Sequence, residues 1–397
     1  MIWNWGIAYQ MTEDLRSKYF RIYFVYFIFF LASGPLESIT SYFYFTYFST
    51  VEYGIFLTIN NIINIVLPTV IASISYKTNT KLVNSIGVII ASLSGIMIGL
   101  YGDKSAFLLI ALSSFLFLGR LVFNNSLGNK ICYSIDEGSS SVFFSLRDLY
   151  LYGGISLGSL VSGFLISRLG YDQAFIVFSL VMLVSLFFSN RIDILKTNET
   201  SDEENRVSIV AIIKKLIRNR VVICLSLIYL SSGVYATAYD FIGSIGLKLG
   251  IDVSVLLTFS GVILMINAIS AYFTSKRVTE HNRKSLFLID IFTDFVPAVL
   301  FALSNSKLLF MLGLFISSIK DAFAPITFSY IVSCFNEEEG FMALALLGSI
   351  SSLFSVIFPI IFGYMIENDS QLLFGTSAGL ILVSVLIAKV LMPDNKD

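Results

Sequence analysis

The sequence predicts an all-α membrane protein with twelve transmembrane helices. Of its 397 residues, 56% are hydrophobic and only 13% are charged, and the mean hydropathy is +0.82. Soluble domains carry about a quarter charged residues, so a surface of this composition needs lipid around it rather than water. The net charge of −1 gives no electrostatic reason to expect nucleic acid as a partner.

Apolar runs of about 20 residues, the length that crosses a bilayer as a helix, recur along the chain. They are continuous rather than alternating, which excludes the strands of a membrane barrel. Twelve spans are expected, at 20–46, 51–75, 82–101, 105–127, 144–167, 172–190, 221–245, 253–274, 285–304, 307–334, 341–366 and 371–392.

The connectors between these spans predict the orientation. With both termini in the cytoplasm, the inner connectors and ends hold nineteen Lys and Arg residues, and the outer connectors hold four. Inner loops of membrane proteins are enriched in basic residues. We therefore expect a multi-pass protein of the cell (cytoplasmic) membrane with both termini in the cytoplasm. No cleavable signal peptide is expected, and Met1 and Met11 both stay open as the start.

A polar stretch at 191–220 divides the spans into two six-helix bundles, 1–190 and 221–397, and we interpret it as a cytoplasmic linker. The two halves repeat weakly at an offset of about 200 residues. The repeat pairs Glu37 with Asp240, Tyr76-Lys77 with Ser275-Lys276-Arg277, Arg120 with Lys320, and Gly163 with Gly363.

Three segments carry motifs that resemble those of the major facilitator superfamily. The fourth span holds a leucine-x-x-x-arginine pattern that ends at Arg120. The fifth span is rich in glycine, with Gly154, Gly158 and Gly163. The loop after the second span holds Tyr76, Lys77 and Lys81, and Tyr76 stands where the family has an acid. The resemblance implies two six-helix pseudo-repeats and a gating role for this loop. The glycine-rich fifth span resembles that of the family's exporters, which implies that the protein belongs to an exporter-like branch.

Ionisable side chains within spans are the main candidates for function, because each costs about 2.5–3.5 kcal/mol to insert. They are Glu37, Arg120, Asp240, Lys320 and Asp321. The resemblance implies that their spans, the first, fourth, seventh and tenth, line a central cavity. Glu37 and Asp240 are then expected to carry protons or bind a cation, and Arg120 and Lys320 to pair with them. The alternative is that the basic residues only neutralise neighbouring acids.

Four further side chains, Tyr42, Asn61, Tyr235 and Tyr239, are possible substrate contacts, with helix packing as the alternative. Asp290 and Asp294 are expected to have a structural role, with Asp290 at a shallow depth and Lys276 and Arg277 as partners. No phosphate loop, nucleophile motif or metal-ligand cluster occurs, so no cofactor, metal or enzymatic activity is expected.

Together these features predict a secondary transporter for a small molecule, driven by protons and embedded as a monomer in the lipid bilayer. The leading hypothesis is efflux of a small amphipathic or cationic molecule. Import of a small nutrient is the alternative within transporters. A non-transporting membrane receptor or assembly partner is the alternative from another class, and its activity would survive Glu37→Gln and Arg120→Ala.

Overall fold

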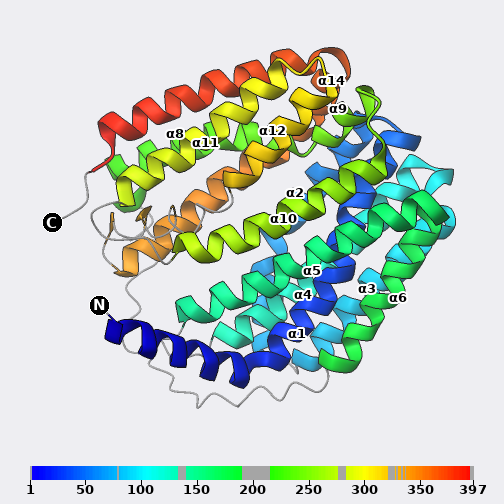
Figure 1. Cartoon of the computed structure of the whole chain (residues 1–397), viewed down its shortest axis with the longest axis horizontal. Helices are drawn as coiled ribbons and strands as arrows, with labels where there is room; N and C mark the ends of the chain where they lie inside the picture. The colour runs from blue at the N-terminus through cyan, green and yellow to red at the C-terminus, as the bar shows by residue number, and fades with distance from the viewer. Residues whose placement is uncertain are drawn as a thin grey trace. The chain divides into compact units, whose positions relative to one another are not determined.

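The computed structural model describes most of the chain, and its regular segments are helical. The described residues are 2–77, 80–132, 140–189, 215–275, 283–320, 327, 330–331, 334–335 and 337–393. Within these ranges no β-strand is found, and the expected all-α class is confirmed (Figure 1). The expected linker at 191–220 lies outside the described residues as far as position 214.

The helices follow the apolar runs of the sequence. They are α1 (Ile2–Tyr47), α2 (Thr50–Lys77), α3 (Thr80–Tyr101), the short 3₁₀ helix η1 (Gly102–Lys104), α4 (Ala106–Cys132), α5 (Ser140–Leu169), α6 (Tyr171–Ser189), α8 (Arg220–Tyr239), α9 (Ile242–Lys248), α10 (Val253–Ser275), α11 (Arg283–Ala302), α12 (Lys307–Lys320) and α14 (Glu337–Leu391).

Among the described residues, nine helices are long and apolar enough to cross a membrane, and two shorter apolar helices lie at Val253–Asn267 and Lys307–Ser318. One of the nine lies in α14 and covers two predicted spans. The non-helical backbone at Asp369 (φ −153°, ψ 86°) separates these two spans. Each of the twelve predicted runs overlaps a described helix. That all twelve cross the bilayer, with both termini inside, stays a prediction.

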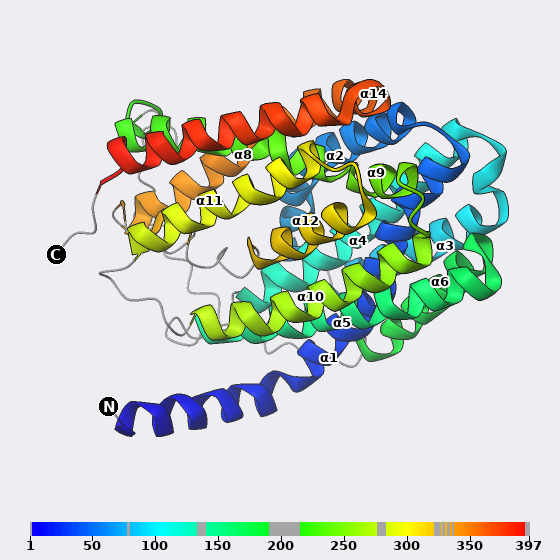
Figure 2. The same cartoon turned by 45° about the horizontal axis from the view of Figure 1, so that its top comes forward.

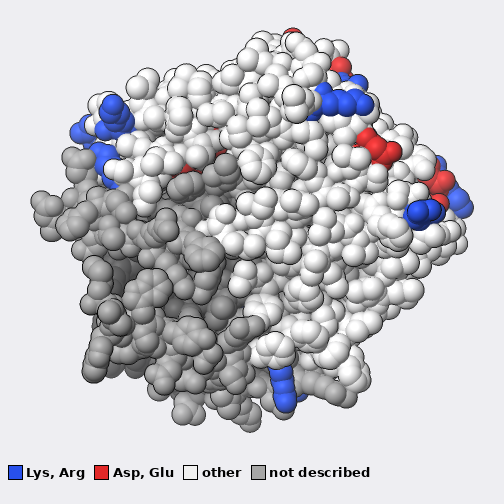
Figure 3. Space-filling view, viewed as in Figure 1, with Lys and Arg blue, Asp and Glu red and all other residues white. Residues whose placement is uncertain are grey.

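Charged side chains are sparse on the described surface. On the face shown in Figure 3 most of the described charged side chains lie toward its edges, and a wide area between them is uncharged. Large apolar side chains such as Phe107, Phe164 and Leu308 are more than half exposed. Such a surface matches lipid, because exposed apolar side chains cost little when the surrounding medium is hydrocarbon.

The first compact unit comprises Met1–Phe43, Val66–Asn198 and Val253–Ala268. Within it, α3 packs against α4 and α6, and α5 packs against α6. The buried face of α1 is aromatic, and the Phe29 ring stacks on Phe123 of α4 with 3.8 Å between centroids. These contacts hold α1 and α4 side by side, which positions the charged residues that each helix carries.

Glycines let α5 lie close to two neighbours within this unit. A Cβ on Gly158 would stand 2.1 Å from the carbonyl oxygen of Leu31 in α1. A Cβ on Gly163 would stand 2.7 Å from the carbonyl oxygen of Ser254 in α10. Small residues at membrane-helix interfaces allow such backbone approach. The glycine-rich pattern of the fifth span therefore serves helix packing in this structure.

The second compact unit comprises Tyr44–Ile65, Glu199–Asp252 and Ile269–Asp397. Its helix α14 packs along α8 and α11, and α11 packs on α12 (Figure 2). Aromatic side chains form its core: the Phe301 ring lies 5.3 Å from Phe374 and 6.1 Å from Tyr239. The Asn219 side chain accepts a hydrogen bond from Val221 N at 2.9 Å and caps the start of α8.

Each unit contains segments from both halves of the sequence. Most of α10 belongs to the first unit, and the first part of α2 belongs to the second. The repeated glycines occupy comparable places: Gly163 of α5 meets α10, and Gly363 of α14 meets the backbone of Thr50 in α2. This parallel supports the internal repeat. The division into 1–190, 191–220 and 221–397 stays a prediction from the sequence.

Candidate functional site

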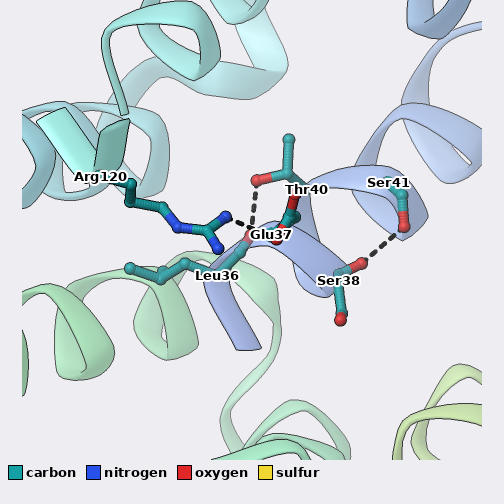
Figure 4. A network of polar contacts seen from close by, with 6 residues as sticks. All are labelled: Leu36, Glu37, Ser38, Thr40, Ser41 and Arg120. Carbon is teal, nitrogen blue, oxygen red and sulfur yellow. Dashed lines mark hydrogen bonds and ion pairs between the residues drawn. The ribbon is translucent and has the colours of Figure 1, made fainter. Parts of the chain in front are cut away.

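The structure brings together Glu37 and Arg120, two of the charged residues singled out in the sequence. Glu37 follows Pro35 in α1, and Arg120 lies in α4. Their side chains form an ion pair within the first unit, with 2.6 Å between Arg120 Nη1 and Glu37 Oε2 (Figure 4). The predicted association of an acid with the fourth-span arginine is therefore present in the geometry.

The two partners differ in exposure. The Arg120 side chain is 16% exposed, whereas the Glu37 side chain is 58% exposed. An ionised carboxylate cannot face hydrocarbon at low cost, so an exposed acid within a span needs water or a polar partner beside it. Because the Glu37 side chain is exposed, a proton or a ligand can reach its carboxylate.

Arg120 keeps hydrogen-bonding capacity beyond this ion pair. Its guanidinium has five N–H donors. Among the described residues its buried Nε has no hydrogen-bond partner. Nearby hydroxyl groups bond within their own helix, since Thr40 donates to Leu36 O at 2.6 Å and Ser41 to Ser38 O at 2.7 Å. The guanidinium therefore has N–H donors that the Glu37 carboxylate does not use.

Asp240 stands at a break between two helices of the second unit. The helix α8 ends at Tyr239, and α9 begins at Ile242, so Asp240 and Phe241 form the joint. The Asp240 side chain is exposed. Discontinuous membrane helices often supply ion and substrate sites in transporters, because the break frees backbone groups beside a polar side chain. A cavity shared by Asp240, Glu37 and Arg120 stays a prediction.

Two of the candidate charges have no described side chain. Lys320 is the last residue of α12, where only its backbone is described, and Asp321 lies outside the described residues. Their expected roles stay predictions.

Comparison with known proteins identifies the family. The family model described as Major Facilitator Superfamily matches residues 22–319. The chain belongs to this superfamily. It is therefore a multi-pass membrane protein with a transporter fold, as the motifs in its sequence suggested.

Solved structures with a similar fold include three superfamily transporters. A variant of the nucleoside transporter NupG aligns with a TM-score of 0.73 and 14% identity, covering 96% of this chain and 100% of that one. A bacterial homologue of the human lysosomal transporter Spinster gives 0.72 and 12%, covering 96% and 99%. A D-xylose–proton symporter gives 0.71 and 14%, covering 95% and 98%. No curated protein matches the sequence of the chain.

The loop that resembles the superfamily's gating motif is only partly described. Tyr76 and Lys77 end α2, and their side chains are outside the described part of the chain. Lys81 lies in the first turn of α3 and is half-buried. A gating role for these three residues in this superfamily member stays a prediction.

The possible substrate contacts engage protein neighbours instead. Tyr42 is 8% exposed, and Tyr235 is 3% exposed with its ring beside Phe374. Tyr239 accepts a hydrogen bond from the Ser317 hydroxyl at 3.0 Å. Asn61 donates from Nδ2 to the carbonyl oxygen of Ser355 at 2.6 Å. These contacts favour the packing interpretation, and substrate contact by these residues stays a prediction.

Asp290 and Asp294 of α11 are buried among protein neighbours, and the shallow membrane depth expected for Asp290 stays a prediction. They are 8% and 2% exposed, and the Thr327 hydroxyl donates to Asp290 Oδ2. The proposed partners Lys276 and Arg277 lie outside the described residues. The spacing of four residues on one helical face was visible in the sequence. It shows that the two acids share a face, but not how deeply that face is buried.

Proposed function

We propose that this superfamily member is a secondary active transporter in which protons drive the movement of a small molecule. The observation that carries the proposal is the ion pair between Arg120 and the exposed Glu37 inside membrane spans. Protonation of Glu37 would cancel its attraction to Arg120 and leave the guanidinium free for a substrate group. A proton and a substrate could thereby control the same contact, which is the requirement for coupling.

Efflux of a small amphipathic or cationic molecule remains the proposed direction. It derives from the glycine-rich fifth span and the exposed acid at Glu37, which could exchange a proton for a cation. The contacts of Gly158 and Gly163 with α1 and α10 also explain these glycines by packing alone. Import by symport is therefore the competing outcome of the test below.

The test uses proteoliposomes that contain a pH-sensitive dye, with uridine, D-xylose and tetraphenylphosphonium as the probes. An exporter moves protons inward while the probe moves outward, and a symporter moves both in one direction. A deletion strain that becomes sensitive to toxic compounds would support export, and a nutritional defect would support import. The proposal fails if no probe moves protons and the deletion strain shows neither phenotype.

Glu37→Gln is expected to abolish proton-driven accumulation of the active probe while probe exchange at equal concentrations persists. The amide keeps the shape of the side chain and can accept a hydrogen bond from Arg120, but it cannot exchange a proton. Accumulation and equal-concentration exchange are measured in the same vesicle preparation. Retention of proton-driven accumulation in the variant would rule out Glu37 as the proton carrier.

A further inference from the structure

The helix α14 has two interruptions, at Pro359 and at Asp369. Pro359 has no N–H, so the carbonyl of Ser355, four residues earlier, loses its helical partner. Within a membrane span such a group needs a partner from elsewhere in the protein. The backbone at Asp369 is non-helical, so the first part of the helix ends just after Ile366 and Glu367, and carbonyls at a helix end commonly take partners from outside the helix.

Donors from two other helices reach carbonyls of α14 near these interruptions. At the proline break, Asn61 Nδ2 of α2 lies 2.6 Å from Ser355 O, and the Thr58 hydroxyl lies 3.0 Å from Val356 O. At the helix end, Lys248 Nζ of α9 lies 2.8 Å from Ile366 O. The breaks in α14 and the donors thus coincide, and all of these residues belong to the second unit.

The first turn of α2 adds a third contact with the same part of α14. The Thr50 hydroxyl donates to Gly363 O at 2.6 Å, and Thr50 N donates to the Glu367 carboxylate at 3.2 Å. A carboxylate at a helix start is favoured by the unpaired N–H groups there. Glycine at 54 and 363 permits the approach, since a Cβ on either would stand 2.5 Å from a backbone oxygen of the other helix.

We propose that Thr50, Thr58, Asn61 and Lys248 form a clasp that holds segment 355–367 of α14 in this conformation and controls how often it opens. The clasp bonds the Ser355 carbonyl, which Pro359 leaves without a helical partner, and carbonyls at Val356, Gly363 and Ile366, so these donors fix the segment to α2 and α9. The inference rests on the proposed transport function in assigning this opening to the transport cycle.

Hydrogen–deuterium exchange on the full-length protein in lipid nanodiscs tests the clasp in four proteins: wild type, Asn61→Ala, Pro359→Ala and the double variant. Asn61→Ala is expected to raise amide exchange within 355–367 about threefold, the ratio that corresponds to a typical hydrogen bond between membrane helices. In the Pro359→Ala background, Asn61→Ala should add nothing, because alanine at position 359 supplies the N–H that Ser355 O lacks.

Asn64→Ala is the matched control, because Asn64 lies exposed on the same helix and should leave exchange in 355–367 unchanged. Thr58→Val repeats the test at Val356 O if Asn61→Ala does not fold. Additive effects of Asn61→Ala and Pro359→Ala, or unchanged exchange in Asn61→Ala, would overturn the clasp. The measurement uses no probe or pH gradient, so its failure is distinguishable from a failure of proton coupling.

Discussion

Arg120→Ala is expected to reduce transport of the active probe at least about tenfold, in both the proton-driven and the equal-concentration assays. Removing one partner of a buried ion pair costs about 3–5 kcal/mol, and less where the remaining charge is exposed. Glu37 is 58% exposed, so part of this penalty is relieved by its surroundings. That penalty concerns the stability of the folded state; where the ion pair also stabilises the rate-limiting step of transport, each 1.4 kcal/mol lost from that step lowers the rate about tenfold.

The control for this prediction is the paired variant Glu37→Gln with Arg120→Gln, which removes both charges and leaves two amides. It should restore the thermal stability lost in Arg120→Ala but not the proton-driven transport, because no proton can be exchanged. Arg120→Lys keeps the charge but presents a single donor group, and should retain an intermediate rate. If the paired variant transports at the wild-type rate, the ion pair serves folding alone.

Gly158→Ala is expected to destabilise the protein by at least about 1–3 kcal/mol, the usual cost of overpacking a tight interface. The added Cβ would stand 2.1 Å from Leu31 O and 2.5 Å from Pro35 Cγ. Leu31 O belongs to the backbone of α1, so the clash is relieved only by moving that helix, which carries Glu37. We therefore expect a lower yield of folded protein and a lower thermal-unfolding midpoint in detergent.

Gly153→Ala is the matched control, because nothing lies within 4 Å of a Cβ at that position of the same helix. Alanine also has the higher helix propensity, so this variant should be neutral or slightly stabilising. Equal unfolding midpoints for Gly158→Ala and Gly153→Ala would show that α1 and α5 are not packed as closely as described.

The helices were predictable because hydropathy is a local property. Every described α-helix overlaps one of the predicted apolar runs, since a membrane span must be both apolar and about 20 residues long. Charges such as Glu37 and Arg120 were also conspicuous, because few ionisable groups occur in such runs. The 2.6 Å contact between them was not predictable from local pattern, since it depends on how α1 packs against α4.

Several features depend on tertiary packing and left no local signal. The joint at Asp240 contains neither proline nor glycine, so nothing in the sequence marks the end of α8 at Tyr239. Asn61 could be interpreted as a ligand or a packing residue, and only the position of Pro359 on another helix explains its bond to Ser355 O. The burial of Asp294 likewise depends on which helices pack against α11, and the sequence of α11 alone does not show this.

Infrared difference spectroscopy of the purified protein in lipid tests most directly whether Glu37 takes up a proton beside Arg120. On acidification, the wild type should show a carbonyl stretch from a newly protonated carboxylic acid, and Glu37→Gln should lack that component. The frequency of this carbonyl stretch should also shift in Arg120→Lys, because the cation closest to the Glu37 carboxyl group has changed. A spectrum for Glu37→Gln that is identical to that of the wild type would contradict a protonatable Glu37 as the basis of coupling.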